Sequence, residues 1–322
     1  QCRVRIDGGF HFSDYPGLKT IPWGITMTLT RREMVALVAA TGLTLSQAGQ
    51  AAQADQPAAL LPLRTPGLDH LDVIVPDVEK SARFYMGLFK TTLHAQPFQG
   101  GQRYFVLLGP LPENRAVGYL AVGASRGRGT YIGHFCTSVE DWRRDSAGIF
   151  AAMKEKFGAA GFGEFGGSTG FGGIFQDPDG IEIQFLPAPD TLVTAAVPSD
   201  LVPGGQGLVT PLRVDSALLN VSDLKRAVAY YRVLYGKESK SSARNAVFSF
   251  KNGSRLLLEQ ATYVYGKAQT RISRYGIRVN PFDRAAVARG IATLGGTVVS
   301  DDGKVLRLRD VDGIELDLVS SD

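Results

Sequence analysis

Three side chains in the first half of the sequence are of the types that hold a divalent metal ion. They are His70, His134 and Glu182, and each lies in a short apolar segment that predicts a β-strand. Two imidazoles and one carboxylate suit Fe, Mn, Zn, Ni or Co. Three protein ligands leave coordination positions open for water and for two substrate oxygens, as Lewis-acid catalysis requires. The set therefore predicts one divalent metal per chain.

Strand alternation places these three side chains on one kind of surface. Along the strand that carries His70, every second residue (71, 73 and 75) is apolar and suits packing beneath a helix, so His70 points to the opposite face. His134 is also opposite an apolar set, and on the last strand Glu182 and Gln184 point away from apolar neighbours. All three candidate ligands are expected on the polar face of a sheet, opposite the face that packs beneath the helices. We call this polar face the cup. The alternative is a pair of satisfied buried histidines and a solvated carboxylate.

Other side chains near these strands are weaker candidates for chemistry. Tyr104, Tyr119 and Asp72 are predicted to face the cup as catalytic residues that donate or accept protons, although aromatic residues in strands more often form core. His94 is expected in the turn after the first helix, with a surface role rather than that of a general base. Cys136 is expected to be a pocket-lining or buried small residue first, and a soft ligand or redox point second.

The composition is that of a globular protein. The chain has 322 residues, enough for two ordinary domains, with 44% hydrophobic and 20% charged residues. These values exclude a disordered or fibrous chain. The net charge of +4 is small, and the Lys and Arg residues form no run or basic helix. Nucleic acid is therefore not expected as a partner.

An internal repeat organises the sequence. The stretch from Asp69 to Phe89 recurs from Asp215 to Tyr235, an offset of 146 residues. In each copy an apolar strand ends at an aspartate, Asp77 or Asp223, which is suited to cap the helix that follows. The helices then carry paired aromatic residues and a helical apolar face. The repeat predicts a duplicated strand–helix unit.

The ends of the two copies also match, and together these matches predict the domain organisation. Asp177–Glu182 parallels Asp310–Glu315, each a tight turn that leads into an alternating final strand. Each copy is predicted to hold two strand–helix–strands modules, so the fold class is α+β with tandem βαβββ modules. A metal-binding domain is expected over residues 55–187, a linker rich in Pro, Gly, Ala and Val over 188–212, and a second domain over 213–322.

The N-terminal region predicts an export signal. Residues 27–54 hold a charged segment with the pair Arg31-Arg32, an apolar stretch of about a dozen residues and a small-residue cleavage site, Ala52-Gln53-Ala54. The paired arginines resemble a twin-arginine (Tat) signal, which exports folded proteins. Residues 1–26 are interpreted as an upstream segment outside the mature protein. The expected location is the periplasm or outside a bacterial cell, with no membrane association after cleavage; an amphipathic N-terminal helix is the alternative.

These motifs resemble those of the vicinal oxygen chelate superfamily, which includes glyoxalase I, extradiol dioxygenases, fosfomycin-resistance proteins and bleomycin-binding proteins. The resemblance covers residues 66–187 well and 213–320 more weakly. It rests on these motifs: Leu68-Asp69-His70-Leu71, Phe84-Tyr85 with Leu88-Phe89, Gly133-His134-Phe135, and Asp177-Pro178-Asp179-Gly180-Ile181-Glu182. It implies two glyoxalase-like domains with cup-shaped sheets and a metal held by His70, His134 and Glu182.

The second copy departs from this pattern. Ser216 replaces His70 at the 146-residue offset, Arg274 falls at roughly the place of His134, and only Glu315 remains of the ligand set. One carboxylate does not hold a catalytic metal, so this copy is expected to be a degenerate domain that is structural or shapes the substrate entrance.

The resemblance implies an exported metal-dependent enzyme, and the leading hypothesis is lyase or isomerase-type chemistry on a small substrate chelated through vicinal oxygens. One alternative is an Fe(II) extradiol-type ring-cleaving dioxygenase. Such enzymes usually carry their metal in the second copy, whereas here the ligands are in the first. Another alternative is a non-catalytic binding or resistance protein, which usually lacks the ligand set. Either a monomer or a homodimer is compatible with fused copies.

Overall fold

The computed structural model of the chain describes residues 60–109, 118–157, 173–188, 197–201 and 207–321. Contacts divide the chain into residues 1–58 and a compact unit of residues 59–322. The predicted upstream segment (1–26) and export signal (27–54) lie outside the described residues and stay predictions. Among the described residues, no helix has the length and apolar character needed to cross a membrane.

The first copy contains two modules that each begin with a strand and a helix. Its first module comprises β1 (Gly67–Val75), α2 (Val78–Leu88), β2 (Leu93–Phe98), β3 (Gly101–Leu108) and β4 (Gly118–Ala124). Its second module comprises β5 (Tyr131–Val139), α3 (Trp142–Phe157), β6 (Gly173–Gln176) and β7 (Glu182–Pro187). The predicted α+β class and strand–helix–strands order are confirmed here.

The second copy repeats this order. Its first module comprises β9 (Thr210–Val221), α4 (Leu224–Tyr235), β10 (Lys240–Ser241), β11 (Asn245–Ser249) and β12 (Arg255–Gln260). After the hairpin of β13 (Tyr263–Val264) and β14 (Lys267–Ala268), its second module comprises β15 (Arg271–Asn280), α5 (Arg284–Thr293), β16 (Thr297–Asp301), β17 (Val305–Arg309) and β18 (Glu315–Ser320). Within the predicted linker, β8 (Val197–Pro198) pairs with β2.

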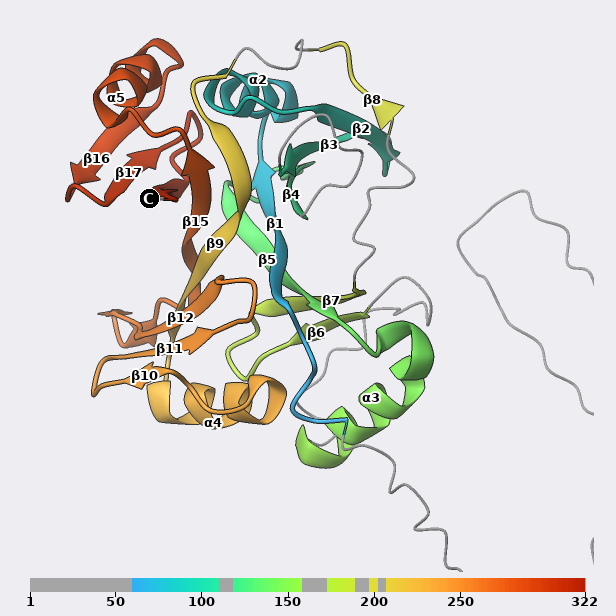
Figure 1. Cartoon of the computed structure of the whole chain (residues 1–322). Coiled ribbons are helices and arrows are strands. Elements are labelled where there is room, and N and C mark those ends of the chain that lie inside the picture. Colours follow the sequence, from blue (N-terminus) through green and yellow to red (C-terminus); the bar gives the residue numbers. More distant parts are fainter. Residues whose placement is uncertain (1–59, 110–117, 158–172, 189–196, 202–206, 322) are drawn as a thin grey trace, which may run out of the picture. The chain divides into compact units, whose positions relative to one another are not determined.

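One pairing rule holds in all four modules. The first strand of each module lies parallel to the last strand of the same module, as in β1–β4, β5–β7, β9–β12 and β15–β18. The first strands then pair antiparallel within each copy, β1 with β5 and β9 with β15. A single bridge between Ile132 and Ile272 joins β5 to β15, so one 16-stranded sheet runs through both copies (Figure 1).

Successive side chains of each strand point to opposite faces of the sheet. One face is covered by helices, and the other is the cup. On β1, Leu71, Val73 and Val75 are fully buried in the main hydrophobic core, whereas His70 and Asp72 point to the other face. The predicted helix caps are confirmed, because the side chains of Asp77 and Asp223 accept hydrogen bonds from backbone N–H groups in the first turns of α2 and α4.

The two copies are joined by a reciprocal pair of buried tyrosine–aspartate hydrogen bonds. On α2, the Tyr85 hydroxyl donates to Asp310 of the second copy at 2.5 Å. On α4, the Tyr231 hydroxyl donates to Asp177 of the first copy at 2.9 Å. Each aspartate opens the tight turn before its final strand. Each copy's first helix is thereby fixed to the other copy's last turn.

Burial makes these aspartates costly to keep charged. Desolvation raises the pKa of Asp177 to about 6, although its hydrogen bonds oppose that rise. Its Oδ1 accepts from the backbone N–H groups of Asp179 at 2.8 Å and Ile181 at 2.9 Å, which leaves Oδ2 for the tyrosine. The hydroxyl of Tyr231 is therefore the remaining donor that this buried carboxyl group uses.

Replacing Tyr231 by Phe tests this link. The Tyr231→Phe variant leaves one oxygen of Asp177 without its donor, so we expect the free energy of unfolding to fall by about 1–3 kcal/mol. The neighbouring Tyr230 is a matched control, since its hydroxyl is buried without a hydrogen-bond partner. Tyr230→Phe removes a hydroxyl that has no hydrogen bond to lose, so we expect it to leave stability unchanged or to raise it. Urea unfolding of both variants measures the difference, and equal losses would contradict the role of the Tyr231–Asp177 bond.

Candidate metal centre

The strand pairing brings together His70 and His134, which lie on the first strands of the two modules of the first copy. β1 and β5 lie antiparallel, with Asp72 opposite His134. The Nε2 atoms of the two imidazoles lie 3.2 Å apart, and the two residues are only 1% and 6% exposed. The structure thus places two of the three predicted ligands side by side.

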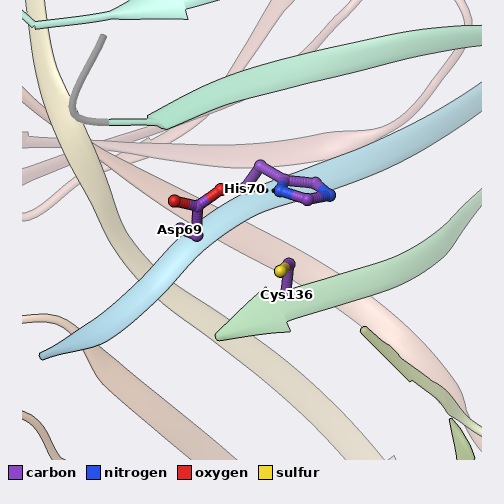
Figure 2. A group of neighbouring side chains, drawn as sticks. All are labelled: Asp69, His70 and Cys136. Atoms are coloured by element: carbon purple, nitrogen blue, oxygen red, sulfur yellow. Dashed lines mark hydrogen bonds and ion pairs between the residues drawn. The ribbon is translucent and has the colours of Figure 1, made fainter. Parts of the chain in front are cut away.

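A carboxylate stands behind each imidazole. Asp69 Oδ1 lies 2.7 Å from His70 Nδ1, and its other oxygen accepts from the Ser138 hydroxyl at 3.1 Å. Figure 2 shows the Asp69 carboxylate directed at the His70 ring. An N–H donated from Nδ1 to a carboxylate fixes the tautomer in which Nε2 carries a lone pair. His70 is therefore oriented to offer Nε2 as a ligand.

The second imidazole has the same kind of support at longer range. Asp72 Oδ2 lies 3.5 Å from His134 Nδ1, and its other oxygen accepts from Arg103 at 2.5 Å. Burial lowers the pKa of His134 to about 4, against the opposing attraction of Asp72. His134 is thus a neutral imidazole near neutral pH, which is the form that binds metals.

The last strand of the copy adds an amide that sequence reasoning did not select as a ligand. Gln184 Oε1 lies 2.8 Å from His70 Nε2, and Gln184 is also a hydrogen-bond partner of His134. Its signal in the sequence was its position two residues after Glu182, on the same face of the strand. With His70 Nδ1 donating to Asp69, both Nε2 and Oε1 are acceptors, so their close approach is favourable only with a cation between them or with the amide reversed.

Glu182, the third predicted ligand, lies beside this cluster. It is the register partner of His134 on the parallel pair β5–β7 and is half-buried at the edge of a cavity. Burial and the nearby Asp72 raise its pKa, while Arg128 and a hydrogen bond with Gln176 lower it. Within the described part of the chain, Glu182 makes no hydrogen bond or ion pair with either imidazole, so its place as a metal ligand stays a prediction.

Of the predicted catalytic tyrosines, one lies at the site and one does not. The Tyr119 ring stacks on His70 with centroids 4.1 Å apart, and its hydroxyl lies 3.3 Å from His70 Nε2. Burial raises the pKa of Tyr119 well above its usual value, so the hydroxyl stays a donor. The placement of Tyr104 in the cup is wrong. Tyr104 belongs to the main core on the helix side, where Glu79 and Arg83 are its charged neighbours, because the strand alternation turns it outward.

Cys136 lies behind the imidazole of His70. Ligand atoms of Asp69, His70 and Cys136 lie within 4.8 Å of one another, and Figure 2 shows the thiol pointing toward the histidine from β5. Burial raises the pKa of the Cys136 thiol well above its usual value. The prediction of a buried small residue is confirmed. His94 lies on β2 rather than in a turn, away from these side chains.

The second copy has the same strand positions occupied by ion pairs. Arg274 is the register partner of Glu315, as His134 is of Glu182, which confirms the predicted correspondence. Arg274 Nε contacts Asp317 at 2.9 Å, and Asp317 occupies the place of Gln184. Guanidinium groups thus neutralise this cup internally, since Arg255 and Arg278 also both contact the fully buried Asp215.

The donor set of the first copy is chemically suited to a divalent metal. Two imidazole nitrogens and an amide oxygen converge, with the Glu182 carboxylate on a nearby position of β7. Carboxylates behind both imidazoles are the usual outer support of histidine ligands. A cavity of about 1050 Å³ opens beside His134, Asp72 and Glu182, so a small molecule has access to the centre.

The low pKa of His134 gives a direct test in the metal-free protein. Because burial sets the pKa to about 4, below the ordinary 6.5, the ring should remain neutral between about pH 5 and 7. The contribution of this group to the free energy of unfolding is then full above 6.5 and is lost as the pH falls toward 4. Long-range ¹⁵N–¹H spectra measure the charge state directly. A His134 ring that titrates near 6.5 would contradict the buried, carboxylate-backed geometry.

Comparison with known proteins agrees with the fold and the motifs. A family model described as glyoxalase/bleomycin resistance protein/dioxygenase superfamily matches residues 67–185. No curated protein matches the chain in sequence. Solved structures similar in fold include the Mn(II)-bound glyoxalase from Novosphingobium aromaticivorans, with a TM-score of 0.57 and 12% identity over 80% of this chain and 83% of that one.

Two ring-cleaving enzymes show the same architecture. The halotolerant catechol dioxygenase BphC has a TM-score of 0.57 and 14% identity over 80% of this chain and 87% of its own. Homoprotocatechuate 2,3-dioxygenase from Arthrobacter globiformis has a TM-score of 0.56 and 16% identity over 82% of each chain. At these identities the likeness concerns the fold, and its coverage takes in both copies. Residues 67–185 thus match the model of the glyoxalase/bleomycin resistance protein/dioxygenase superfamily, in agreement with the resemblance of the motifs to the vicinal oxygen chelate superfamily.

Proposed function

We propose that the protein is a metal-dependent enzyme that binds a small substrate through vicinal oxygens and carries out lyase or isomerase-type chemistry. The observation that carries this proposal is the convergence of His70 Nε2, His134 Nε2 and Gln184 Oε1 beside an open cavity. With the amide oxygen of Gln184 directed at the imidazoles, these atoms all offer lone pairs, and they repel one another unless a cation lies among them. The residues of the first copy therefore favour metal binding over a purely structural histidine pair.

A bound divalent metal would act as a Lewis acid that stabilises an enolate or oxyanion of the substrate. The chain's own residues prepare the site for this task. Asp69 and Asp72 orient the two imidazoles, and Arg103 holds Asp72 in place. The protonated Tyr119 hydroxyl is a donor beside His70.

Glu182 combines two properties that proton transfer requires. It lines the cavity, and burial raises its pKa above the ordinary value. Its position beside His134 also keeps it within the predicted ligand set. We propose that β7 supplies both the charge of Glu182 and the amide oxygen of Gln184 to the centre.

Metal content of the purified protein tests the centre. We expect about one divalent metal per chain, and His70→Ala and His134→Ala should each lose it because both remove a nitrogen ligand. His94→Ala is the matched control, since His94 lies on β2 outside the cluster. Mass spectrometry of the metal provides the readout. A protein that stays metal-free after reconstitution would mean that the cavity only binds a ligand, in line with the non-catalytic alternative.

Exchanging charge between two positions of β7 separates the roles of Glu182 and Gln184. Gln184→Glu adds a negative charge beside the imidazoles, and we expect metal affinity to rise by roughly 10-fold or more. Glu182→Gln removes a charge but keeps an oxygen, and we expect affinity to fall. Competition with a fluorescent chelator measures both. Unchanged affinity in Gln184→Glu would show that this amide does not face the metal.

An Fe(II) ring-cleaving dioxygenase is the second candidate, because BphC and the homoprotocatechuate enzyme share the fold. The site lies in the first copy, which disfavours this reaction by the pattern that two-copy relatives follow. Incubation of the Fe(II)-loaded protein with catechol under air distinguishes the two. A yellow ring-fission product would favour the dioxygenase, and we expect none.

A further inference from the structure

The cavity beside the metal centre has an arginine-rich rim that the metal chemistry does not use. Arg126, Arg128 and Arg271 line it, together with the ion pair of Asp72 and Arg103. The acidic residues of the lining are Asp72, Asp179 and Glu182. What this rim recognises depends on which of these charges are already neutralised inside the protein.

Most of the negative charge is already paired. Asp72 accepts from Arg103, and Asp179 accepts from Arg226 at 2.6 Å and from the backbone N–H of Ser222 at 2.9 Å. Arg226 is not among the residues that line the cavity, so Asp179 is held from outside. Only the carboxylate of Glu182 remains to balance the rim.

The positive charge, in contrast, is left for a ligand. Arg126 donates to the backbone carbonyl of Gln99, a neutral acceptor. Within the described residues, Arg128 and Arg271 have no ion-pair partner, and both are exposed. Arg128 and Glu182 line the same cavity, and the charge of Arg128 opposes the rise in the pKa of Glu182. The rim therefore carries more cationic than anionic charge.

The two copies build this rim together. Arg126 and Arg128 alternate with glycines in the turn after β4, where Arg126, Gly127 and Gly129 all have positive φ. Arg271 begins β15 of the second copy, and the next residue, Ile272, forms the bridge to Ile132. The bridge between the copies thus fixes the arginine of the degenerate domain at the mouth of the first copy's cavity.

The lining of the cavity also contains an apolar band, which consists of Ile74, Ile132, Ile174 and Ile272 together with the aromatic ring of Phe98. A ligand in the cavity can therefore contact hydrocarbon side chains and guanidinium groups as well as His134 and Glu182. Guanidinium groups match planar carboxylates with paired hydrogen bonds.

We propose that the substrate is an organic acid whose carboxylate is bound by Arg128 and Arg271. Its vicinal oxygens lie at the metal centre, and its apolar body contacts the apolar band. The position of the vicinal oxygens rests on the proposed function. The carboxylate subsite is inferred independently, from the two arginines that line the cavity. It also gives the second copy a role, which is to supply one wall of the substrate site.

Hydroxamic acids test the proposal, because the hydroxamate group chelates metals through vicinal oxygens and is not a substrate of the proposed reactions. The probes are 4-carboxybenzohydroxamic acid and 4-(carboxymethyl)benzohydroxamic acid, each compared with its neutral methyl ester. Calorimetry of the zinc-loaded full chain should show at least one acid binding about 10-fold more tightly than its ester, the effect of charge-assisted hydrogen bonds. Added salt should reduce the difference.

Variants identify the residues responsible. In the double variant Arg128→Gln, Arg271→Gln the preference for the acid should disappear, while the ester should bind as before. Arg289→Gln, an exposed arginine on α5 away from the cavity lining, should keep the preference. Circular dichroism confirms that each variant is folded.

The same titrations on chelator-treated protein test the metal centre and the carboxylate subsite separately. If the metal proposal fails but the arginine subsite exists, the acid keeps its advantage over the ester and chelator changes neither affinity. If the subsite is absent but the metal is present, acid and ester bind equally and chelator abolishes both. Equal affinities, or no binding of any probe up to its solubility limit, would overturn the carboxylate subsite.

Discussion

The structure depends on the reciprocal hydrogen bonds by which each copy's first helix holds the other copy's last turn. A carboxyl group buried without donors is strongly unfavourable, so Asp177 and Asp310 require the hydroxyls of Tyr231 and Tyr85. The turn at Asp177 leads directly into β7 at Glu182. The side chains that β7 presents to the metal centre are therefore positioned through a residue of the second copy.

The two cups show how one backbone supports two electrostatic solutions. In the first, the imidazoles of His70 and His134 and the amide oxygen of Gln184 converge, with carboxylates behind the imidazoles. In the second, guanidinium groups occupy the equivalent strands and satisfy the carboxylates themselves, as in the contacts of Arg274 with Asp317 and of Arg278 with Asp215. A guanidinium is a permanent cation, so the second cup has no need of a metal to balance its acids. Loss of the ligand set there has been accompanied by an internal charge balance.

The bridge that joins the sheets of the two copies also brings residues of the second copy into the lining of the cavity. Ile272 pairs with Ile132, and both lie in the apolar band of the cavity. The cavity thus has a floor from the first copy and part of its mouth from the second. The second copy can in this way influence which molecules enter the cavity beside the candidate metal centre.

The sequence by itself determined the duplicated α+β architecture, the helix caps at Asp77 and Asp223, and the cup-facing positions of His70, His134 and Glu182. Strand alternation and local capping are properties of neighbouring residues, so they can be read without knowing the fold. Alternation did not settle Tyr104, because the phase of that strand was not marked by a clear polar face. Only the tertiary structure decided that Gln184 reaches His70, that Asp69 and Asp72 stand behind the imidazoles, and that Arg271 faces the cavity. These contacts join strands distant in sequence, and their distances follow from the strand register and the crossing of the two copies, which no local pattern encodes.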